Sequence, residues 1–419
     1  MRRCVAILLV LAVLSGLAVP CFAAQQSSKK DNSLKSLNQN IEAYAYILAS
    51  LNEGTVSIAA QHNAREVLYP ASLTKIATAM VTINKVKDLS RSVTVSKAAV
   101  ESQINTGSQI AYLREGEKIS YEELLYLSML FSACDACQVL AEAVGGSVKE
   151  FVKMMNEWAT SVGCENTHFV NPDGLHDDNH YSTATDLLKM STAALQNSTF
   201  KKISTATSFD YNGSTFYHTN RMLHPLLDEY YYQYAKGIKT GYTKEAGNCL
   251  ITMAENKGIT FLAIVLRSVA KKIDDKWIAM SYIDAKNLFE WGFKNFEKRS
   301  VCGTNDVMGH ALVGGGKELY VPVCAQRAAS VIVPKGANPN EIQTTIKPNS
   351  AASQAPIQQG EVLGSAVFSY NDNVVGNVPV IAAVGVKEAP LRSFLPQFDA
   401  YIHDKPVFGV FAILLSLFT

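Results

Sequence analysis

The chain contains a serine and a lysine that could together perform nucleophilic chemistry, Ser72 and Lys75. A spacing of three residues places the two side chains on one face of a helix, within reach of each other. A serine hydroxyl is a poor nucleophile until a neighbouring group takes its proton. A lysine can take that proton when burial against apolar surface lowers its pKa. The pair is a weak signal by itself, because serine and lysine fall at this spacing by chance in many chains.

Two further strings strengthen this signal. A Ser-Ala-Cys string at 132–134 stands at a predicted junction of two helices, and a Lys-Thr-Gly string at 239–241 precedes a predicted β-hairpin. Lys239 and Thr240 could hold an anionic group. Gly241, which has no side chain, would let a substrate lie against the strand. Three such strings in this order are much more specific than the first pair.

Four stretches of the chain carry a resemblance to a known family: YPASLTKIATAM at 69–80, GSQIAYLREGEKISYEELLYLSMLFSACDAC at 107–137, FVNPDGLHDDNHYSTATDL at 169–187 and GIKTGYTKEAG at 237–247. The sequence resembles the penicillin-recognising serine DD-peptidases. Among them it is similar to the D-alanyl-D-alanine carboxypeptidases, the low-molecular-mass penicillin-binding proteins. The resemblance covers about residues 41–295 and continues through a β-domain and an amphipathic tail to the C-terminus.

The resemblance implies a reaction and three catalytic residues. Ser72 would be the acylated nucleophile, Lys75 its general base, and Ser132 the relay of a proton to the leaving amine. The substrates would be peptidoglycan stem peptides ending in D-Ala-D-Ala. Attack on the terminal amide gives an acyl-enzyme and releases D-alanine, and water then cleaves the acyl-enzyme. β-Lactam antibiotics would act as covalent inhibitors, and neither a cofactor nor a metal is implied.

The resemblance also implies a substrate site. Lys239 and Thr240, followed by Gly241, would hold the terminal carboxylate. The backbone N–H groups of the nucleophile and of Tyr242 would form the oxyanion hole. One position departs from the usual pattern, because Cys134 stands where most members have asparagine, although some relatives carry cysteine. A thiol donates and accepts hydrogen bonds only weakly, so substrate positioning would be looser or the balance between hydrolysis and transfer altered.

Three rival functions remain open at this point. A DD-transpeptidase would transfer the acyl group to an amine, and the sequence does not decide between hydrolysis and transfer. A serine β-lactamase shares the three strings, but it would need neither the β-domain nor the tail, and no clear Glu-containing deacylation loop is present. An inactive penicillin-binding wall protein would have lost turnover through Cys134, and the intact Ser72 and Lys75 count against it.

The elements that must position these residues indicate an α/β fold, with a β-lactamase/transpeptidase-like antiparallel sheet flanked by helices. Ser120 followed by Glu123 forms a capping box at the start of a helix. The other predicted elements are a hairpin at 45–60, a helix at 71–86, a second hairpin at 249–266 and a helix at 281–293. Short Val- and Gly-rich strands then predict a small all-β domain, with strands at 318–323, 328–333, 362–368 and 378–384.

The two ends of the chain indicate export and membrane association. Arg2 and Arg3, an apolar run and small residues before the cut predict a signal peptide ending at Ala23; an uncleaved anchor helix is the alternative. The last twelve apolar residues would span about 18 Å as a helix, short of the roughly 30 Å hydrocarbon core. We therefore expect the tail to lie in one leaflet, on the outer face of the cytoplasmic membrane. A buried C-terminal helix is the alternative.

These readings divide the chain into a signal peptide (1–23), a flexible leader (24–40), the catalytic domain (41–295), the β-rich domain (296–388) and the tail (389–419). The chain has 419 residues, 48% of them hydrophobic and 18% charged, which is enough to bury large cores. A net charge of +1 argues against a nucleic-acid partner, because nucleic-acid binders carry a strong basic excess.

Several residues permit a second interpretation. Export allows disulfides, and Cys302 with Cys324 is the best candidate pair. Cys134 and Cys137 resemble half of a redox or zinc site, but no second half exists at metal spacing.

A functional and a structural interpretation are also both open for a histidine pair, a tyrosine cluster and one aspartate. His176 and His180 could share a metal, but they follow a turn string, so a loop beside the active site is the better reading. The tyrosines at 230–234 are expected to pack or to form a wet rim. Asp135 is expected to cap a helix.

Overall fold

The structure is a computed structural model and describes Leu37, residues 41–226 and residues 229–389. The predicted signal peptide, the predicted leader apart from Leu37, and the predicted tail beyond Ala389 lie outside the described residues. In the part of the chain that is described, no helix is both long and apolar enough to cross a membrane.

A five-stranded antiparallel sheet forms the centre of the catalytic part, in the order β2-β1-β9-β8-β7. Its central strands are apolar and nearly fully buried, because helices cover both faces. Both predicted hairpins are confirmed, as β1–β2 and β8–β9. The edge strand β7 was not predicted, and it carries the Lys-Thr-Gly string. The strands are β1 (Ala45–Asn52), β2 (Thr55–His62), β7 (Ala235–Thr243), β8 (Gly247–Asn256) and β9 (Ile259–Ser268).

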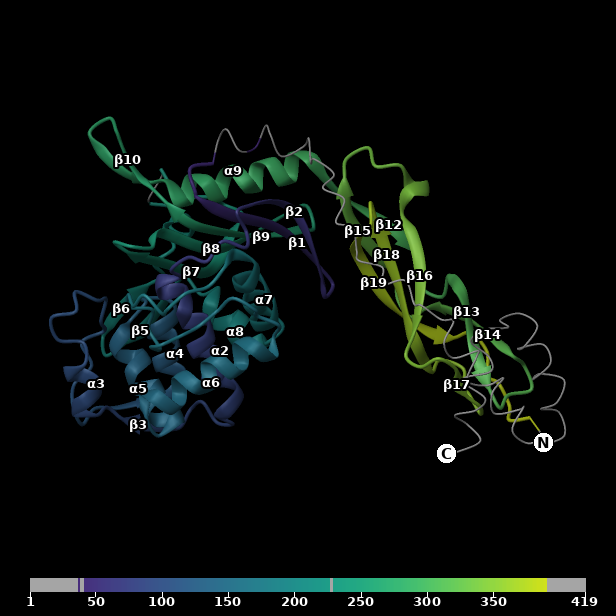
Figure 1. The fold of residues 1–419 in the computed structure, drawn as a ribbon, viewed down its shortest axis with the longest axis horizontal. Coiled ribbons are helices and arrows are strands. Elements are labelled where there is room, and N and C mark those ends of the chain that lie inside the picture. The colour runs from purple at the N-terminus through teal and green to yellow at the C-terminus, as the bar shows by residue number, and fades with distance from the viewer. Residues whose placement is uncertain (1–36, 38–40, 227–228, 390–419) are drawn as a thin grey trace, which may run out of the picture. The chain divides into compact units, whose positions relative to one another are not determined.

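Figure 1 shows the helices on the two sides of this sheet, with α9 (Met280–Asn295) on one face and the other helices gathered against the opposite face. The predicted closing helix at 281–293 is therefore confirmed. The helices of the opposite side are α2 (Lys75–Lys85), α3 (Lys97–Glu101), α4 (Tyr121–Met129), α5 (Cys134–Gly145), α6 (Val148–Ser161), α7 (Ala184–Leu195) and α8 (Ser198–Ser204). Short strand pairs and a turn complete this part: β3 (Ser92–Thr94) with β4 (Lys118–Ser120), β5 (Ser208–Tyr211) with β6 (Ser214–Tyr217), β10 (Ala270–Ile273) with β11 (Lys276–Ala279), and the 3₁₀ turn η4 (Arg221–Leu223).

The predicted helix at 71–86 forms as two pieces. A 3₁₀ turn, η3 (Ala71–Thr74), comes first and leads directly into α2. Every residue of α2 up to Thr82 is buried, because the helix runs through the middle of the hydrophobic core between the sheet and the outer helices. The tight opening turn sets the nucleophile ahead of a rigid, buried helix.

Helix α4 begins with the predicted capping box, in which Ser120 and Glu123 satisfy each other's backbone N–H groups. The prediction for Asp135 was wrong. Helix α5 has Ala133 at its N-cap, and Asp135 lies inside the first turn. The Asp135 carboxylate instead accepts hydrogen bonds from the backbone N–H groups of Ala111 and Leu113, so it fixes a neighbouring loop.

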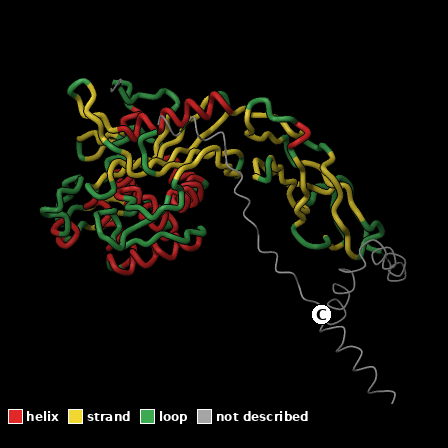
Figure 2. The backbone as a smooth tube through the Cα atoms, turned by 45° about the horizontal axis from the view of Figure 1, so that its top comes forward, coloured by secondary structure: helices red, strands yellow, loops and turns green. Residues whose placement is uncertain are grey.

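The C-terminal part is all-β apart from the short 3₁₀ turn η5 (Pro339–Glu341) (Figure 2). A six-stranded sheet runs in the order β16-β18-β19-β14-β13-β17, and β12 pairs with β15. All four predicted strands of this part are present. The strands are β12 (Phe296–Cys302), β13 (Val307–Gly314), β14 (Tyr320–Ala325), β15 (Ala329–Pro334), β16 (Gln343–Pro348), β17 (Ser353–Gln354), β18 (Val362–Tyr370) and β19 (Asn373–Ala382).

The expected disulfide of the β-rich part is wrong, because Cys302 and Cys324 are both free thiols. Cys302 ends β12 and lies opposite Ala329 of β15, whereas Cys324 on β14 lies opposite Val307 of β13. The two residues therefore belong to different strand pairs. Both side chains are buried, so they pack as small apolar groups.

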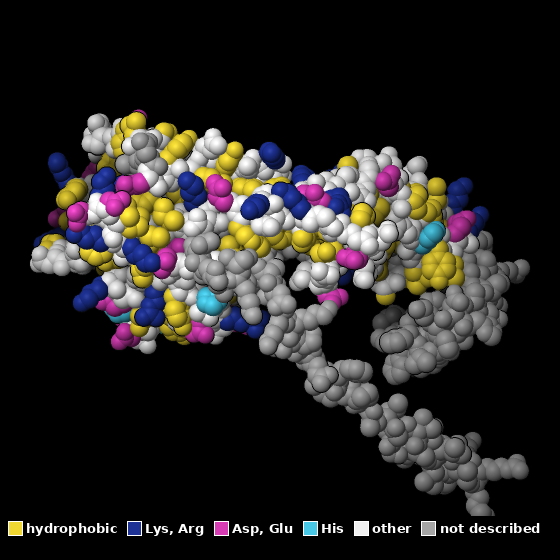
Figure 3. Space-filling model, turned by 90° about the horizontal axis from the view of Figure 1, so that it is seen from above, with side chains coloured by type: hydrophobic (Ala, Val, Ile, Leu, Met, Phe, Trp, Pro, Cys, Tyr) yellow, Lys and Arg dark blue, Asp and Glu magenta, His cyan; other side chains and the backbone are white. Residues whose placement is uncertain are grey.

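Basic and acidic side chains are interspersed on the face of the described residues that Figure 3 shows, with apolar side chains scattered between them. This mixed surface agrees with the near-zero net charge of the sequence.

Candidate active site

The three strings, which are far apart in the sequence, meet in one cleft of about 760 Å³. Seven predicted or neighbouring residues from these strings give its walls their chemistry. The rest of the walls comes from the loops at 106–109 and 173–176, from Thr219, from the turn at 244–245 and from residues of β8 and α9. The residues from the strings and their immediate neighbours are Ser72, Ser132, Cys134, Thr240, Gly241, Tyr242 and Thr243. The cleft therefore contains most of the predicted site.

Lys75 is placed to act on Ser72. Its Nζ donates a hydrogen bond to Ser72 Oγ at 2.8 Å and a second one to the backbone oxygen of Asp173 at 2.6 Å. The Cys134 Sγ lies 3.4 Å from the same nitrogen. Lys75 is fully buried, so its amine is held at the base of the cleft and cannot reach bulk water.

Two glycines let other segments lie directly against the nucleophile turn. Gly174 has a φ of +83°, and a Cβ there would lie 2.0 Å from the oxygen of Ala71. A Cβ on Gly241 would lie 3.0 Å from the Pro70 oxygen and 3.2 Å from the Ser72 nitrogen. The glycine of the third string is therefore needed for the approach of β7 to the nucleophile turn, and not only, as predicted, for the approach of substrate.

The Lys-Thr-Gly string presents a hydroxyl to the cleft and keeps its lysine behind it. Thr240 Oγ1 lies 2.6 Å from Thr219 Oγ1, and both threonines line the cleft. Lys239 is fully buried, and its Nζ donates to the backbone oxygen of Thr240 at 3.0 Å. Tyr242 is 67% exposed at the mouth of the cleft. An anion at Thr240 would thus receive hydroxyl hydrogen bonds and the field of an ammonium group from behind.

Ser132 and Cys134 lie at the turn between α4 and α5. Ser132 has a left-handed φ of +66°, an uncommon conformation for serine that is typical of sites where a side chain must be aimed. Cys134 is held by a hydrogen bond from its backbone nitrogen to the oxygen of Gln109 at 2.8 Å. No hydrogen bond joins the Ser132 hydroxyl to Ser72 or Lys75 among the described residues.

The buried charges of the site compete for protons. Burial lowers the pKa of Lys75. Negative charge on the two α5 thiols and on Asp173 raises the pKa, and the net shift is upward. Burial also raises the pKa of the Cys134 and Cys137 thiols, so both are neutral at neutral pH and their part of that shift is absent. Burial and the nearby Lys75 ammonium hold the pKa of Lys239 well below its usual range. Of the two buried lysines, Lys75 is therefore the one that holds its proton more strongly.

Sequence reasoning missed two residues of this site. Asp173 belongs to the Asn-Pro-Asp-Gly string, which was interpreted only as a turn within a family-like stretch, yet its backbone oxygen is an acceptor for Lys75. Thr219 stands outside every recognised string, and only the fold brings it to Thr240. The adjacent Pro172 oxygen accepts from Thr78 Oγ1 at 2.5 Å, so this turn is fixed along the length of α2.

The histidines and tyrosines for which a second interpretation was open make packing and hydrogen-bond contacts within the fold. The His180 ring lies 2.7 Å from Thr74 Oγ1 and accepts from the backbone nitrogen of Val170, and burial lowers its pKa to about 4. No cluster of three or more metal-ligating side chains exists among the described residues. Of the tyrosines, Tyr230 and Tyr232 are buried and pack as predicted.

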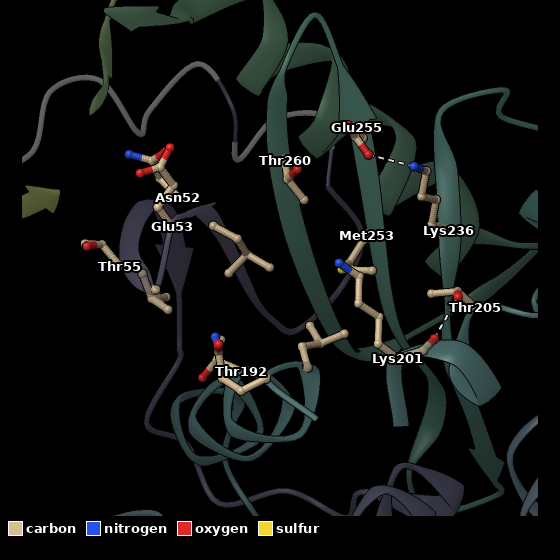
Figure 4. Close-up of a pocket in the computed structure, with 15 residues that line it drawn as sticks. Asn52, Glu53, Thr55, Thr192, Lys201, Thr205, Lys236, Met253, Glu255 and Thr260 are labelled. Atoms are coloured by element: carbon tan, nitrogen blue, oxygen red, sulfur yellow. Dashed lines mark hydrogen bonds and ion pairs between the residues drawn. The ribbon is translucent and has the colours of Figure 1, made fainter. Parts of the chain in front are cut away.

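A second pocket, of about 400 Å³, contains none of the predicted site residues. Figure 4 shows it between the tip of the β1–β2 hairpin and the ends of β8, α7 and α8, with a single ion pair, Lys236 to Glu255, across one wall. It offers no nucleophile paired with a base, so the larger cleft is the candidate active site.

Comparison with known proteins assigns the chain to a family. Residues 30–269 match the D-alanyl-D-alanine carboxypeptidase family, and residues 296–388 match the penicillin-binding protein 5 C-terminal domain. D-alanyl-D-alanine carboxypeptidase DacF of Bacillus subtilis is 30% identical over 408 residues, covering 95% of this chain and 98% of that protein. D-alanyl-D-alanine carboxypeptidase DacC of Escherichia coli is 29% identical over 379 residues, covering 88% and 89%.

Solved structures share the fold. Penicillin binding protein 5 from Haemophilus influenzae has a TM-score of 0.66 at 26% identity and covers 83% of this chain and 98% of its own. The Streptomyces K15 DD-transpeptidase has a TM-score of 0.54 at 31% identity and covers 61% and 98%. The chain belongs to the D-alanyl-D-alanine carboxypeptidase family. The predicted activity, a serine-type D-Ala-D-Ala carboxypeptidase, and the predicted fold class are confirmed.

Proposed function

We propose that Ser72 is the residue that carries the acyl group during removal of the terminal D-alanine. The observation that carries this proposal is the 2.8 Å hydrogen bond from Lys75 Nζ to Ser72 Oγ at the base of the cleft. A base within hydrogen-bond reach of the hydroxyl is the first geometric requirement for nucleophilic catalysis. Lys75 takes the Ser72 proton as Oγ attacks the carbonyl carbon of the D-Ala–D-Ala amide.

Substrate binding would prepare Lys75 for this step. The terminal carboxylate binds at Thr240, in front of the buried Lys239, and its negative charge favours a protonated Lys239. Two buried ammonium groups repel each other, so a charged Lys239 makes Lys75 release its proton more readily. The amine that activates Ser72 thereby becomes a competent base once a correct substrate is bound.

The remaining residues stabilise the transition state and complete the transfer. The backbone N–H groups of Ser72 and Tyr242 receive the developing oxyanion. Ser132 passes its hydroxyl proton to the nitrogen of the leaving D-alanine and regains a proton from the Lys75 ammonium. Cys134 lies beside the substrate amide as a weak hydrogen-bonding partner in place of asparagine. Water then hydrolyses the Ser72 ester and regenerates the enzyme.

The proposal is tested by measuring D-alanine release from a pentapeptide ending in D-Ala-D-Ala. Ser72→Ala should remove the acyl-enzyme route and reduce release to the uncatalysed background, while Ser90→Ala, at an exposed serine outside the cleft, should behave as wild type. Release by Ser72→Ala at the wild-type rate would contradict the proposal.

Transfer to an amine is the second candidate reaction, and Cys134 is the observation that favours it. A weaker hold on the substrate amide changes how the acyl-enzyme meets water or an amine. A protein described as a DD-transpeptidase is among the structures with this fold. Products of the pentapeptide reaction with and without an amino-acid acceptor measure the ratio of transfer to hydrolysis. Benzylpenicillin turnover in the same assay measures the β-lactamase alternative.

We also propose that the protein is exported and held on the outer face of the cytoplasmic membrane by residues 389–419, with β-lactams as its covalent inhibitors. The family and its peptidoglycan substrate support export, and the apolar period of the C-terminal sequence supports the anchor. The secreted chain should begin at Ala24. A chain ending at Glu388 should stay in solution and still react with penicillin. Retention of that chain on membranes after a salt wash would place the anchor elsewhere.

A further inference from the structure

Asp173 is a buried carboxylate that the reaction described above does not use. Its side chain is only 1% exposed. Oδ2 accepts hydrogen bonds from the side-chain amides of Gln138 at 2.8 Å and Gln103 at 3.4 Å, and Oδ1 accepts from the backbone nitrogen of Leu175 at 3.0 Å. All three donors are neutral. A buried carboxylate without a nearby cation is costly, so its charge requires a counter-ion.

The fully buried Lys75 is the lysine that the structure joins to this residue. Its Nζ donates to the backbone oxygen of Asp173 at 2.6 Å, while the Asp173 side chain is held in place by helix α5 and by the loop at 103–109. One residue thus fixes the position of the Lys75 amine through its carbonyl. Its carboxylate forms no direct ion pair with that amine among the described residues, and it acts on Lys75 through its electrostatic field. The same loop reaches the cleft wall, because Gln103 Oε1 accepts from Ser108 Oγ at 2.8 Å.

We propose that Asp173 is a positioning residue for the acylation step, whose buried carboxylate is the counter-ion of Lys75 and sets the pH range in which Lys75 can act as the base for Ser72. This inference rests on the proposed function of Lys75. It adds a residue that touches neither substrate nor the reacting atoms and acts through the base.

The other groups around Lys75 do not supply this charge. The Cys134 and Cys137 thiols of α5 are buried, and burial raises the pKa of both. Lys239 on β7 and His180 oppose a proton on Lys75, and burial lowers the pKa of each. Asp173 is the carboxylate among the described groups whose charge raises the pKa of Lys75. Its removal should therefore make Lys75 easier to deprotonate.

The test is the pH dependence of Ser72 acylation by benzylpenicillin, with each rate profile scaled to its own plateau. Asp173→Asn removes the charge and nearly keeps the shape, and the acid limb should shift to lower pH by about one unit or more. Asp173→Ser should shift the limb in the same direction, and Asp173→Glu should restore it. These two variants keep the test decisive if Asp173→Asn folds poorly.

Two matched variants separate charge from support. Gln138→Leu breaks the hydrogen-bond network but leaves the carboxylate, so it should lower the plateau without moving the limb. Asp178→Asn removes a charge from a side chain of the same loop that is 87% exposed, and it should move neither. Coincident acid limbs for Asp173→Asn, Asp173→Ser and wild type would overturn the inference. Lys75→Ala, measured alongside, tests the proposed function separately, because full acylation without that amine would refute the base and not only its counter-ion.

Discussion

The two ends of the cleft are built differently, although each contains a fully buried lysine. At the nucleophile end, Lys75 has the Ser72 hydroxyl, the Asp173 carbonyl and the Cys134 sulfur within hydrogen-bonding distance. At the carboxylate end, the Lys239 amine donates a hydrogen bond to the backbone oxygen of the next residue, Thr240. The nucleophile end is thus held together by the protein's own groups, whereas the carboxylate end contains a buried amine that a substrate carboxylate can pair with.

The difference indicates how proton transfer can depend on substrate. Burial and the nearby Lys75 ammonium hold the pKa of Lys239 well below its usual range. An incoming carboxylate favours the protonated form of Lys239, and this charge weakens the hold of Lys75 on its proton. The four predictions that follow test this contrast, from the largest expected effect to the smallest.

Removal of the Lys75 amine should have the largest effect. Lys75→Ala leaves Ser72 without a base, and general-base catalysis is worth about 10²- to 10⁴-fold. Acylation by benzylpenicillin should slow by this factor, as measured by the rate of adduct formation. Lys85→Ala, at the exposed end of the same helix, serves as the control. Loss of less than tenfold would mean that the nucleophile end is not organised around Lys75.

The nucleophile end should also lose its support in acid. The pKa of buried His180 falls from an ordinary 6.5 to about 4, so its contribution to stability is complete above about pH 6.5 and is lost as the pH falls toward 4. The loss should approach about 3 kcal/mol. The stability difference between wild type and His180→Asn, measured by urea unfolding, should shrink over this range. His176→Asn, in the same loop, is the control, and a pH-independent difference for His180→Asn would contradict the assignment.

Removal of Lys239 should affect only substrates with a free carboxylate. Lys239→Ala should lower kcat/KM for such peptides by about 10- to 150-fold, since one charge-assisted contact costs about 1.5–3 kcal/mol. Peptides with an amidated C-terminus serve as the matched comparison. Equal losses on both kinds of peptide would show that Lys239 does not recognise the carboxylate.

The smallest change is expected at Cys134, whose thiol lies at the nucleophile end beside Lys75. Cys134→Asn should preserve acylation of Ser72 and make peptide hydrolysis faster. The barrier to hydrolysis should fall by about 1 kcal/mol, because one neutral hydrogen bond is at stake. A reductant and a zinc chelator should leave wild-type activity unchanged. In this structure Cys134 and Cys137 are free thiols. A change in activity on adding dithiothreitol would instead favour a disulfide between them.

The residues that the sequence revealed are those whose chemistry depends on short spacing. Ser72 and Lys75 lie one helical turn apart, and the capping box of Ser120 and Glu123 follows the same local rule. The contacts that were missed join distant segments. Asp173 contacts Lys75, which lies 98 positions away in the sequence. Thr219 contacts Thr240 only because the fold places β7 beside it. A local pattern carries no information about such pairs.

Two errors have the same origin. Cys302 and Cys324 flank what is locally a strand, but the sheet order puts them on different strand pairs. Asp135 is a residue type that commonly caps helices. Its carboxylate instead accepts hydrogen bonds from backbone N–H groups of the loop at 111–113. In both cases the tertiary neighbours decided the outcome. The domain boundaries and the roles of the individual site residues stay predictions.

The most direct test of the account is peptide mapping by mass spectrometry after brief treatment with benzylpenicillin, with and without a competing D-Ala-D-Ala peptide. The account predicts a single adduct on Ser72, formed more slowly when the peptide is present and absent from Ser72→Ala. An adduct on another residue, or full labelling of Ser72→Ala, would contradict it.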